Sequence, residues 1–255
     1  MGESYGGISG LRHQIVIMRY AILADIHSNW EALETAVHYL AKKKINEVWV
    51  LGDTVGYGAN PNECFDWVIQ HARVALMGNH EKAVIEPSLR EDFNPEAKIA
   101  VAWTAEVLKP EHQKKIRGLP YLHIRSSSTA AHGSPDEPET FRYLFSFADA
   151  RPSFAVFKTP ICFVGHTHYP ALFTESKGTT DYLAAGKYAL KKEERYIINP
   201  GSVGQPRDWN PRLGFGIFDD EEWTFEQVRL EYDYRKAAEK IRQAGLPASL
   251  ADRLS

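Results

Sequence analysis

Glu47-Val-Trp-Val-Leu-Gly-Asp53 is an apolar run that ends abruptly in a glycine and an acid. Residues 48–51 are nearly all apolar and β-favouring, which predicts a strand that is buried on both faces. Gly52 lets the backbone turn at the carboxyl end of this strand, so we expect Asp53 in the crevice where open α/β sheets bind their ligands. Taken alone, Asp53 could equally cap the helix that follows.

The same pattern of strand, polar loop and helix stands on both sides of this stretch. Residues 20–24 form an apolar run that stops at Asp25-Ile-His27-Ser-Asn29, and apolar residues at helical spacing follow. Residues 74–77 stop in the same way at Gly78-Asn79-His80-Glu81. Three successive βα units predict a parallel sheet with its polar loops at one edge and the strand before Asp53 in the middle.

The second half of the chain predicts a second sheet. Residues 82–119 have a helical character and are too short to bury a core of their own, so we expect a helical insert. An amphipathic segment is expected over residues 141–150 and a tail helix over 233–244. Short apolar runs predict strands at 121–125, 128–132 and 161–164, and antiparallel strands of the second sheet at 172–174, 196–199, 214–219 and 224–232.

Length and composition bound the class of protein. In these 255 residues we expect one domain over residues 18–255, preceded by a flexible leader, rich in Gly and Ser, over residues 1–17. The formal net charge of −3 gives no general attraction to nucleic acid or to anionic membranes. No apolar run approaches the roughly 20 residues of a membrane span. Cys64 and Cys162 lie among apolar residues, which indicates reduced core thiols of a cytoplasmic protein, with a disulfide between them as the alternative.

Five loops that follow apolar runs carry side chains that can bind metal ions. Taken one at a time, each of these loops has a structural explanation as a turn, a helix cap or a site of a hydrogen-bonded histidine. However, five of the ten histidines directly follow strand-like runs beside Gly, Asp or Asn, and core packing does not explain that placement. The candidates are Asp25 and His27, Asp53, Asn79 and its neighbour His80, His132, and His166 and His168.

This set of side chains suits two divalent cations. Cations roughly 3.5 to 4 Å apart need a bridging carboxylate, and Asp53 is the central candidate because its strand is flanked by the other two. Two cations, the carboxylates of Asp25 and Asp53, and a bridging hydroxide leave a net positive charge that suits a phosphate ester. A third carboxylate in place of Asn79 would cancel that charge. Nitrogen and oxygen ligands without thiolate favour Mn²⁺, Fe, Zn²⁺ or Ni²⁺ and disfavour Cu(I).

The motifs D-x-H, G-D, G-N-H-E, H-G-S and G-H-T-H, in this order, resemble those of the calcineurin-like metallophosphoesterases. The resemblance spans residue 18 to about residue 254 and implies the fold of that superfamily, a four-layer α-β-β-α sandwich of two mixed sheets. It is closer still to the compact bacterial and archaeal phosphodiesterase-like branch, through Gly52-Asp-Thr-Val-Gly-Tyr-Gly58, Asn199-Pro-Gly-Ser-Val-Gly-Gln-Pro-Arg-Asp208 and Ala244-Gly-Leu-Pro247.

The resemblance implies a role for each candidate residue. His80 would position the phosphate or protonate the leaving oxygen, a role worth about 10² to 10⁴ in rate. Arg207 and Tyr57 are candidates for contact with the substrate, and a structural role of Arg207 in its Pro-rich loop is an equal alternative. The two metal ions, with Mn²⁺ as the first choice, would be held by two sets of ligands that share Asp53: Asp25, His27, Asp53 and His168, and Asp53, Asn79, His132 and His166.

One departure from the family bears on the substrate. The protein Ser/Thr phosphatases of this superfamily carry Asp and Arg after the G-D motif, where this chain has Gly56 and Tyr57. In those phosphatases the Asp orients the catalytic histidine and the Arg grips the phosphate. Their absence argues against a phosphoprotein substrate.

These observations predict a two-metal phosphoesterase that hydrolyses a small phosphodiester or nucleotide by in-line attack of a metal-bridging hydroxide. A phosphomonoesterase and a dinucleoside polyphosphate hydrolase are alternatives, because they share the metal centre and differ in loops such as residues 56–62 and the insert, which we expect to overhang the site. A non-catalytic scaffold on the same fold is an alternative of another class, although this chain retains the ligand set and His80. The sequence shows no basic stripe for nucleic acid, which argues against a nuclease.

Overall fold

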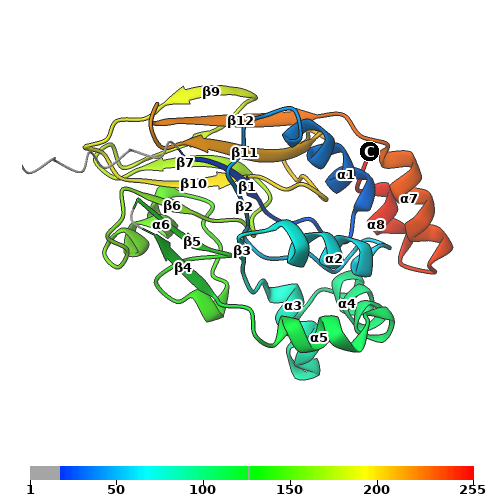
Figure 1. The fold of residues 1–255 in the computed structure, drawn as a ribbon. Coiled ribbons are helices and arrows are strands. Elements are labelled where there is room, and N and C mark those ends of the chain that lie inside the picture. Colours follow the sequence, from blue (N-terminus) through cyan, green and yellow to red (C-terminus); the bar gives the residue numbers. More distant parts are fainter. Residues whose placement is uncertain (1–17, 126) are drawn as a thin grey trace, which may run out of the picture.

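The computed structural model describes residues 18–125 and 127–255, and the leader expected at residues 1–17 lies outside this part of the chain. Figure 1 shows two stacked sheets with helices around them. The first six-stranded sheet contains, in spatial order, β3 (Val74–Ala75), β2 (Glu47–Val50), β1 (Arg19–Leu23), β11 (Leu213–Asp219), β12 (Thr224–Leu230) and β9 (Gly186–Ala189). The second six-stranded sheet contains β4 (Leu122–Arg125), β5 (Ser128–Ala131), β6 (Ile161–Phe163), β10 (Tyr196–Pro200), β7 (Pro170–Thr174) and β8 (Thr179–Tyr182).

The strand β2, which ends just before Asp53, lies between β1 and β3 as expected. It runs parallel to both neighbours, and its register places Val50 beside Leu23 of β1 and Ala75 of β3. In the second sheet, β6 runs parallel to β5 and to β10. The polar loops after β1, β2 and β3 therefore leave the first sheet at one edge, which confirms the arrangement predicted from the three βα units.

Two strands that we expected in the second sheet belong to the first. The strand β11 pairs antiparallel with β1, and β12 continues the same sheet beyond it. Arg19 lies opposite Asp219 in this register, with Arg19 Nε 2.6 Å from Asp219 Oδ2. The strand β11 is buried along its whole length. An apolar run shows that a strand is buried but not which partner it pairs with, and this is why the sequence pattern misplaced it.

The elements missing from the prediction are short and polar. The edge strands β8 and β9 are mostly exposed, so they lack the apolar alternation that indicates a strand. The helix α8 (Ala248–Asp252) covers little more than one turn. The amphipathic segment expected at residues 141–150 becomes the helix α6 (Phe147–Phe154), which begins later because the Ser146 side chain caps it by accepting the Asp149 N–H.

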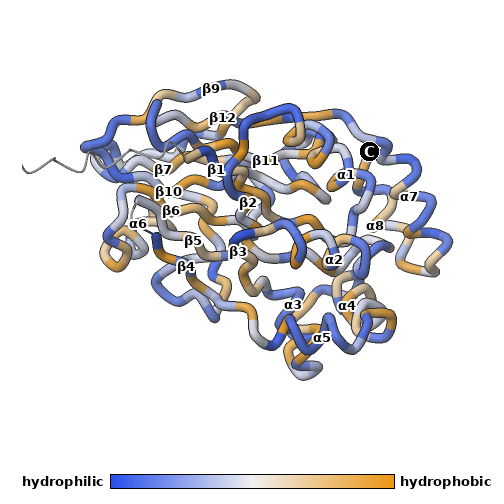
Figure 2. Tube along the Cα trace, in the orientation of Figure 1, coloured by the Kyte–Doolittle hydropathy of each residue, from blue (hydrophilic) through white to orange (hydrophobic). Residues whose placement is uncertain are grey.

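The main core lies between the two sheets. Trp49, Phe218 and Phe225 of the first sheet are buried there against Phe163 of the second, whose ring centre lies 5.6 Å from that of Phe218. Figure 2 shows hydrophobic stretches along the central strands and hydrophilic ones along the outer turns. Burial of large aromatic side chains of this kind is the main source of stability in a domain.

Helices cover the outer face of each sheet, which completes the four layers that the resemblance implies. On the first sheet, α1 (Trp30–Leu40) and α2 (Pro61–His71) contribute Leu33 and Val68 to a cluster around Phe215 of β11. The helix α7 (Tyr234–Gln243) packs beside α1. On the second sheet, α6 places Phe154 against Phe173 of β7.

Three helices between β3 and β4 form a separate group, which lies below the strands in Figure 1. They are α3 (Asn79–Ile85), α4 (Pro95–Val107) and α5 (Pro110–Ile116), with a 3₁₀ helix over Pro87–Asp92 between the first two. These helices bury Val84, Val101 and Ile116 together with Phe65 of α2. The helical segment thus begins at Asn79, inside the polar loop, rather than at residue 82. Within the residues that the structure describes, no helix is both long and apolar enough to cross a membrane.

Candidate metal centre

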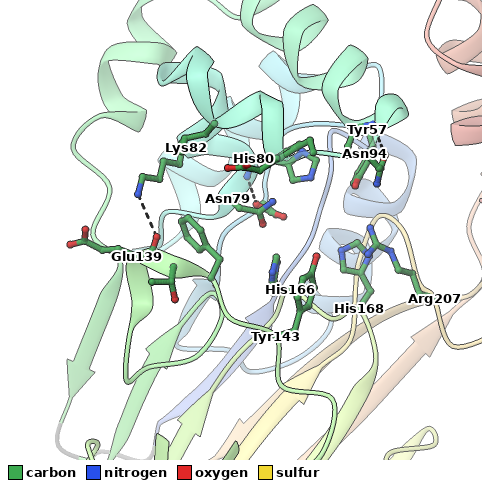
Figure 3. A pocket seen from close by; sticks show the side chains of 17 residues that line it. Tyr57, Asn79, His80, Lys82, Asn94, Glu139, Tyr143, His166, His168 and Arg207 are labelled. Atoms are coloured by element: carbon green, nitrogen blue, oxygen red, sulfur yellow. Dashed lines mark hydrogen bonds between the residues drawn. The ribbon is translucent and has the colours of Figure 1, made fainter. Parts of the chain in front are cut away.

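The side chains that the sequence singles out as metal ligands meet where the polar edges of the two sheets lie together. They come from the loops after β1, β2, β3, β5 and β6, and all are buried except Asn79, which is half-buried. Several of them surround the cavity in Figure 3. Three groups have ligand atoms within 4.8 Å of one another: Asp25, His27 and His168; His27, Asp53 and His80; and Asp53, His132 and His166.

In the first group, two imidazoles face each other without a proton to share. His27 Nε2 lies 3.1 Å from His168 Nε2. The Nδ1 atoms of these rings lie 3.2 Å and 2.5 Å from the carbonyl oxygens of Val55 and Gln205, and because a carbonyl only accepts, each Nδ1 carries the proton. Both Nε2 atoms then direct lone pairs to one place, and an Asp25 oxygen lies 3.4 Å from His168 Nε2. A cation there would satisfy all three acceptors.

The group of Asp53, His132 and His166 repeats this arrangement. His132 Nδ1 lies 2.9 Å from the Leu51 carbonyl oxygen and donates to it, so Nε2 is the atom that would bind a cation after giving up its proton. That Nε2 atom lies 3.1 Å from His166 Nδ1 and 3.2 Å from Asn79 Oδ1, which is an amide acceptor. Atoms that can bind a cation therefore converge at a second place as well.

Asp53 stands between the two groups. Its Oδ2 atom is 3.6 Å from His27 Nε2 and 3.3 Å from His132 Nε2. Its Oδ1 atom accepts the main-chain N–H of His80 over 2.9 Å. One carboxylate oxygen is thus fixed by the backbone, while the other faces both histidine groups. This donor set fits a pair of divalent cations that share one carboxylate.

Burial and neighbouring charges set the protonation of these groups. Burial lowers the pKa of His27, His166 and His168 well below its ordinary value, so these imidazoles are neutral, the form that binds a metal ion. Burial acts to raise the pKa of Asp53, but the positive charge of His132 holds it well below its ordinary value. Against the opposite effect of burial, Asp53 raises the pKa of His132 to about 9. A proton on His132 therefore supplies the positive charge that a bound cation would otherwise give Asp53.

The loops of the centre hold an unusual number of residues in left-handed backbone conformations. Ten non-glycine residues have a positive φ in the described part of the chain, and seven of these belong to the loops of the centre. Each such residue costs about 1 kcal/mol or more, and such strain persists where surrounding contacts impose it. The seven residues are Asp25, His27, Ser28, Asp53, Tyr57, His166 and His168.

Glu81 organises the centre, and the sequence analysis assigned it no role. Its carboxylate is fully buried and accepts the main-chain N–H groups of Asp53 over 2.8 Å, Val55 over 3.0 Å and Gly78 over 3.0 Å. It therefore joins the loop after β2 to the loop after β3. The G-N-H-E motif contains Glu81, but a motif does not reveal that a side chain turns inward to the backbone.

The end of β10 and the loop after it have a similar role between the two sheets. Asn199 donates from Nδ2 to the Gly165 carbonyl over 2.7 Å, which fixes the loop that carries His166 and His168. Ser202 Oγ donates to the Asp25 carbonyl over 2.8 Å. The Asn-Pro-Gly-Ser stretch of the sequence thus connects the ligands of one sheet to those of the other.

A cavity of about 500 Å³ lies over the centre (Figure 3). Tyr57 and Arg207, the two expected substrate contacts, both line it, and the Arg207 guanidinium carbon lies 5.9 Å from the centre of the Tyr57 ring. Arg207 also donates to Gln205 Oε1 over 3.0 Å, so it has a structural contact as well. Tyr143 lines the cavity too and stacks on His166, with ring centres 3.8 Å apart and planes at 17°. The sequence analysis missed Tyr143 because it lies outside every recognised motif.

His80 lies beside the centre and lines the cavity. Its buried Nδ1 atom has no hydrogen-bond partner within the described residues. Burial lowers the pKa of His80 to about 4. Gly56 lies against this ring with a φ of +89°, and a Cβ atom added to it would overlap His80 Nδ1. Gly56, which stands where the protein phosphatases carry Asp, therefore leaves room for the His80 ring and has no side chain to contact it.

The two mixed sheets and the shared Asp and His cluster define this protein as an α/β sandwich with a metal centre. The family model of the calcineurin-like phosphoesterases matches residues 18–170. The chain belongs to this family, and the resemblance of its motifs is confirmed. The family and the cluster together make it a metal-dependent phosphoester hydrolase.

Individual relatives cover nearly the whole chain. An uncharacterized protein of Methanocaldococcus jannaschii is 38% identical over 239 residues, which are 92% of this chain and 96% of that protein. The crystal structure of a metallophosphoesterase from Sphaerobacter thermophilus is 38% identical, with a TM-score of 0.84, and covers 93% of this chain and 98% of its own. A hypothetical protein from Pyrococcus horikoshii has the same fold at 19% identity, with a TM-score of 0.74 over 93% of this chain and 97% of its own.

The contacts of Glu81 predict that Glu81→Gln destabilises the protein. In the parent, three main-chain N–H groups donate to the Glu81 carboxylate. The Gln amide replaces one of the two carboxylate oxygens by an NH₂ donor, so at least one buried N–H group loses its acceptor. We expect the free energy of unfolding in urea to fall by about 1.5 to 3 kcal/mol. Glu63→Gln, at an exposed position of α2, is the matched control and should change it by less than about 0.5 kcal/mol. Equal effects of the two substitutions would contradict the role assigned to Glu81.

The contact between Gly56 and His80 predicts a second effect that a control can isolate. Gly245 also has a positive φ, of +70°, but a Cβ atom there would meet nothing within 4 Å. Gly245→Ala should therefore cost only the backbone strain, about 1 kcal/mol. Gly56→Ala adds the overlap with His80, so we expect it to cost about 1 to 3 kcal/mol more in thermal or urea unfolding. Equal losses would show that His80 does not pack against Gly56.

Proposed function

We propose that this protein is a two-metal hydrolase of a small phosphodiester or nucleotide, with Mn²⁺ as the leading candidate metal. The observation that carries the proposal is the position of Asp53, whose one free oxygen faces two sets of nitrogen and oxygen acceptors. Such an arrangement does not serve the fold, since it gathers carboxylate, amide and imidazole groups in a buried place where a proton on His132 compensates only part of them. It suits a pair of cations that share a carboxylate.

The proposed ligands follow from the two groups of acceptors. Two bound divalent cations supply a Lewis acid for the phosphoryl group and acidify a water molecule. The ligands contain no thiolate, and their neutral amide and imidazoles keep the centre positive enough for an anionic ester. Asp25, His27, Asp53 and His168 would hold one cation, and Asp53, Asn79, His132 and His166 the other.

His80 is proposed as the residue that assists the leaving group. It is the histidine of the cluster whose main-chain N–H is held by Asp53 while its ring lines the cavity. With Nδ1 buried without a partner, the ring can present an Nε2–H group to an ester oxygen of a bound substrate. This hydrogen bond would orient the phosphate. To protonate the leaving oxygen the ring would first take up a proton at its free Nδ1 atom, which the negative charge of a bound phosphate favours, and would return to neutral imidazole after giving up the Nε2 proton.

The walls of the cavity support a small substrate. The 3₁₀ helix, the residues after it and the helix α4 contribute Leu89, Phe93 and Ala97 to the wall, so the insert lines one side of the cavity. Tyr57 occupies the position where protein phosphatases carry a phosphate-binding Arg, and it is buried. A cavity of about 500 Å³ with these walls accommodates a nucleotide-sized ester more readily than an extended protein segment.

The cysteines support a reducing compartment. Cys64 and Cys162 are both buried and free. Free buried thiols are typical of proteins that work where disulfides are reduced. We therefore propose a cytoplasmic location.

Substitution of the shared carboxylate and of His80 tests the mechanism. With Mn²⁺ present, we expect Asp53→Asn to lower the hydrolysis of bis-p-nitrophenyl phosphate to near the background rate and to weaken Mn²⁺ binding in calorimetry. His80→Ala should lower kcat by about 10² to 10⁴ and leave Mn²⁺ binding nearly unchanged. His38→Ala, an exposed histidine of α1, is the control and should behave like the parent. Parent-like rates of both site variants would exclude the proposed mechanism.

Removal of metal gives an independent test. After dialysis against a chelator, we expect the activity to vanish, and Mn²⁺ titrated into this protein should bind with a stoichiometry near two. Bound cations should also raise the unfolding temperature, because the acceptors that now face one another gain a partner. Full activity in the metal-free protein would contradict the proposal.

A further inference from the structure

The cavity extends beyond the metal centre to a lysine that the proposed mechanism does not use. Lys82 belongs to α3, one turn of which also carries Asn79 and His80, and it lines the same cavity as Arg207. In Figure 3 the Lys82 and Arg207 side chains lie on opposite sides of the labelled histidines. The cavity therefore offers one cationic side chain on each side of the centre.

Aromatic rings hold the Lys82 ammonium group in place. Its Nζ atom lies 5.4 Å from the ring centre of Tyr121 and 5.7 Å from that of Phe141. It also lies 3.4 Å from the Glu139 carbonyl oxygen, a long hydrogen bond. The side chain is half-buried, so these contacts replace part of its hydration. An ammonium group has three donors, and the contacts of Lys82 use only one of them.

Lys82 also lacks a carboxylate partner. Within residues 18–125 and 127–255, no carboxylate oxygen lies within 4.0 Å of Lys82 Nζ, whereas Lys98, Lys109 and Lys187 each pair with an acid. Asp92 and Glu139 line the cavity as well, but both are exposed and hydrated. A cation with spare donors, held by rings at the wall of a cavity, is suited to an anion that enters that cavity.

We propose that Lys82 binds a second phosphate group of the substrate while the phosphate ester that is cleaved lies at the Asp and His cluster. This inference rests on the proposed function and narrows the substrate to esters that carry at least two phosphate groups. Lys82 then determines specificity without taking part in the chemistry. Lys82 follows His80 by two residues in one short helix, so the main-chain positions that carry the two side chains have a fixed separation.

Binding of linear bisphosphonates tests the second site. The probes are the alkane-α,ω-bisphosphonates from propane to hexane and, for each, the alkylphosphonate of the same length, titrated into Mn²⁺-loaded protein in a calorimeter. At one chain length we expect the bisphosphonate to bind about tenfold more tightly than the monophosphonate, the gain from one charged hydrogen-bonded contact. Lys82→Met keeps the apolar stem over the rings and should remove this advantage, and Lys82→Arg should keep most of it.

Two further variants complete the design. Glu139→Gln removes a negative charge from the same wall and should strengthen bisphosphonate binding a few-fold. Lys114→Met, an exposed lysine of α5 outside the cavity, should leave the ratio of affinities unchanged. The inference is overturned if the ratio is the same in the parent and in Lys82→Met at every chain length. If instead no phosphonate binds and bis-p-nitrophenyl phosphate is not hydrolysed, the proposed function itself fails.

Discussion

The sharing of one buried carboxylate between two sets of histidines is the constraint on which the rest of the site depends. Asp53 cannot turn away, because its Oδ1 atom and its main-chain N–H are both held, the first by the His80 N–H and the second by Glu81. The histidines on either side are held in turn by backbone carbonyls through their far nitrogens. Such indirect contacts fix the orientation of the candidate ligands. The left-handed residues of these loops show that the arrangement is imposed by the fold against local preference.

Much of this could be predicted from the sequence, for a physical reason. A parallel sheet places the carboxyl ends of its strands together, so polar residues after successive apolar runs must meet, and Asp25, Asp53 and Asn79 do so. Side chains that act by hydrogen bonds to main-chain groups could not be predicted. Glu81 and Asn199 fix the loops by hydrogen bonds that bridge distant parts of the chain, and no spacing encodes such contacts. Tyr143 stacks on His166 because the segment before α6 lies against the loop after β6, a contact between loops that no sequence pattern indicates.

The errors in the fold have a different origin. Apolar runs identified β11 and β12 as strands but did not indicate that β11 pairs with β1, because a hydrophobic pattern carries no information about the neighbouring strand. The exposed strands β8 and β9 are defined by pairing alone and carry no pattern. Gly56 is a contrasting case. The sequence showed a departure from the protein phosphatases, and the structure explains it, because the His80 ring fills the space that a side chain at this position would need.

The short helix α3 concentrates four unlike tasks in four consecutive residues. Asn79 reaches toward the cluster, His80 toward the cavity, Glu81 toward the backbone of two loops, and Lys82 toward the aromatic rings of the far wall. A helix turns by about 100° per residue, so successive side chains must point in four different directions. Each of these four side chains therefore makes a contact that the other three cannot replace, so a shift of this one turn would disturb the cluster, the cavity and two loops together.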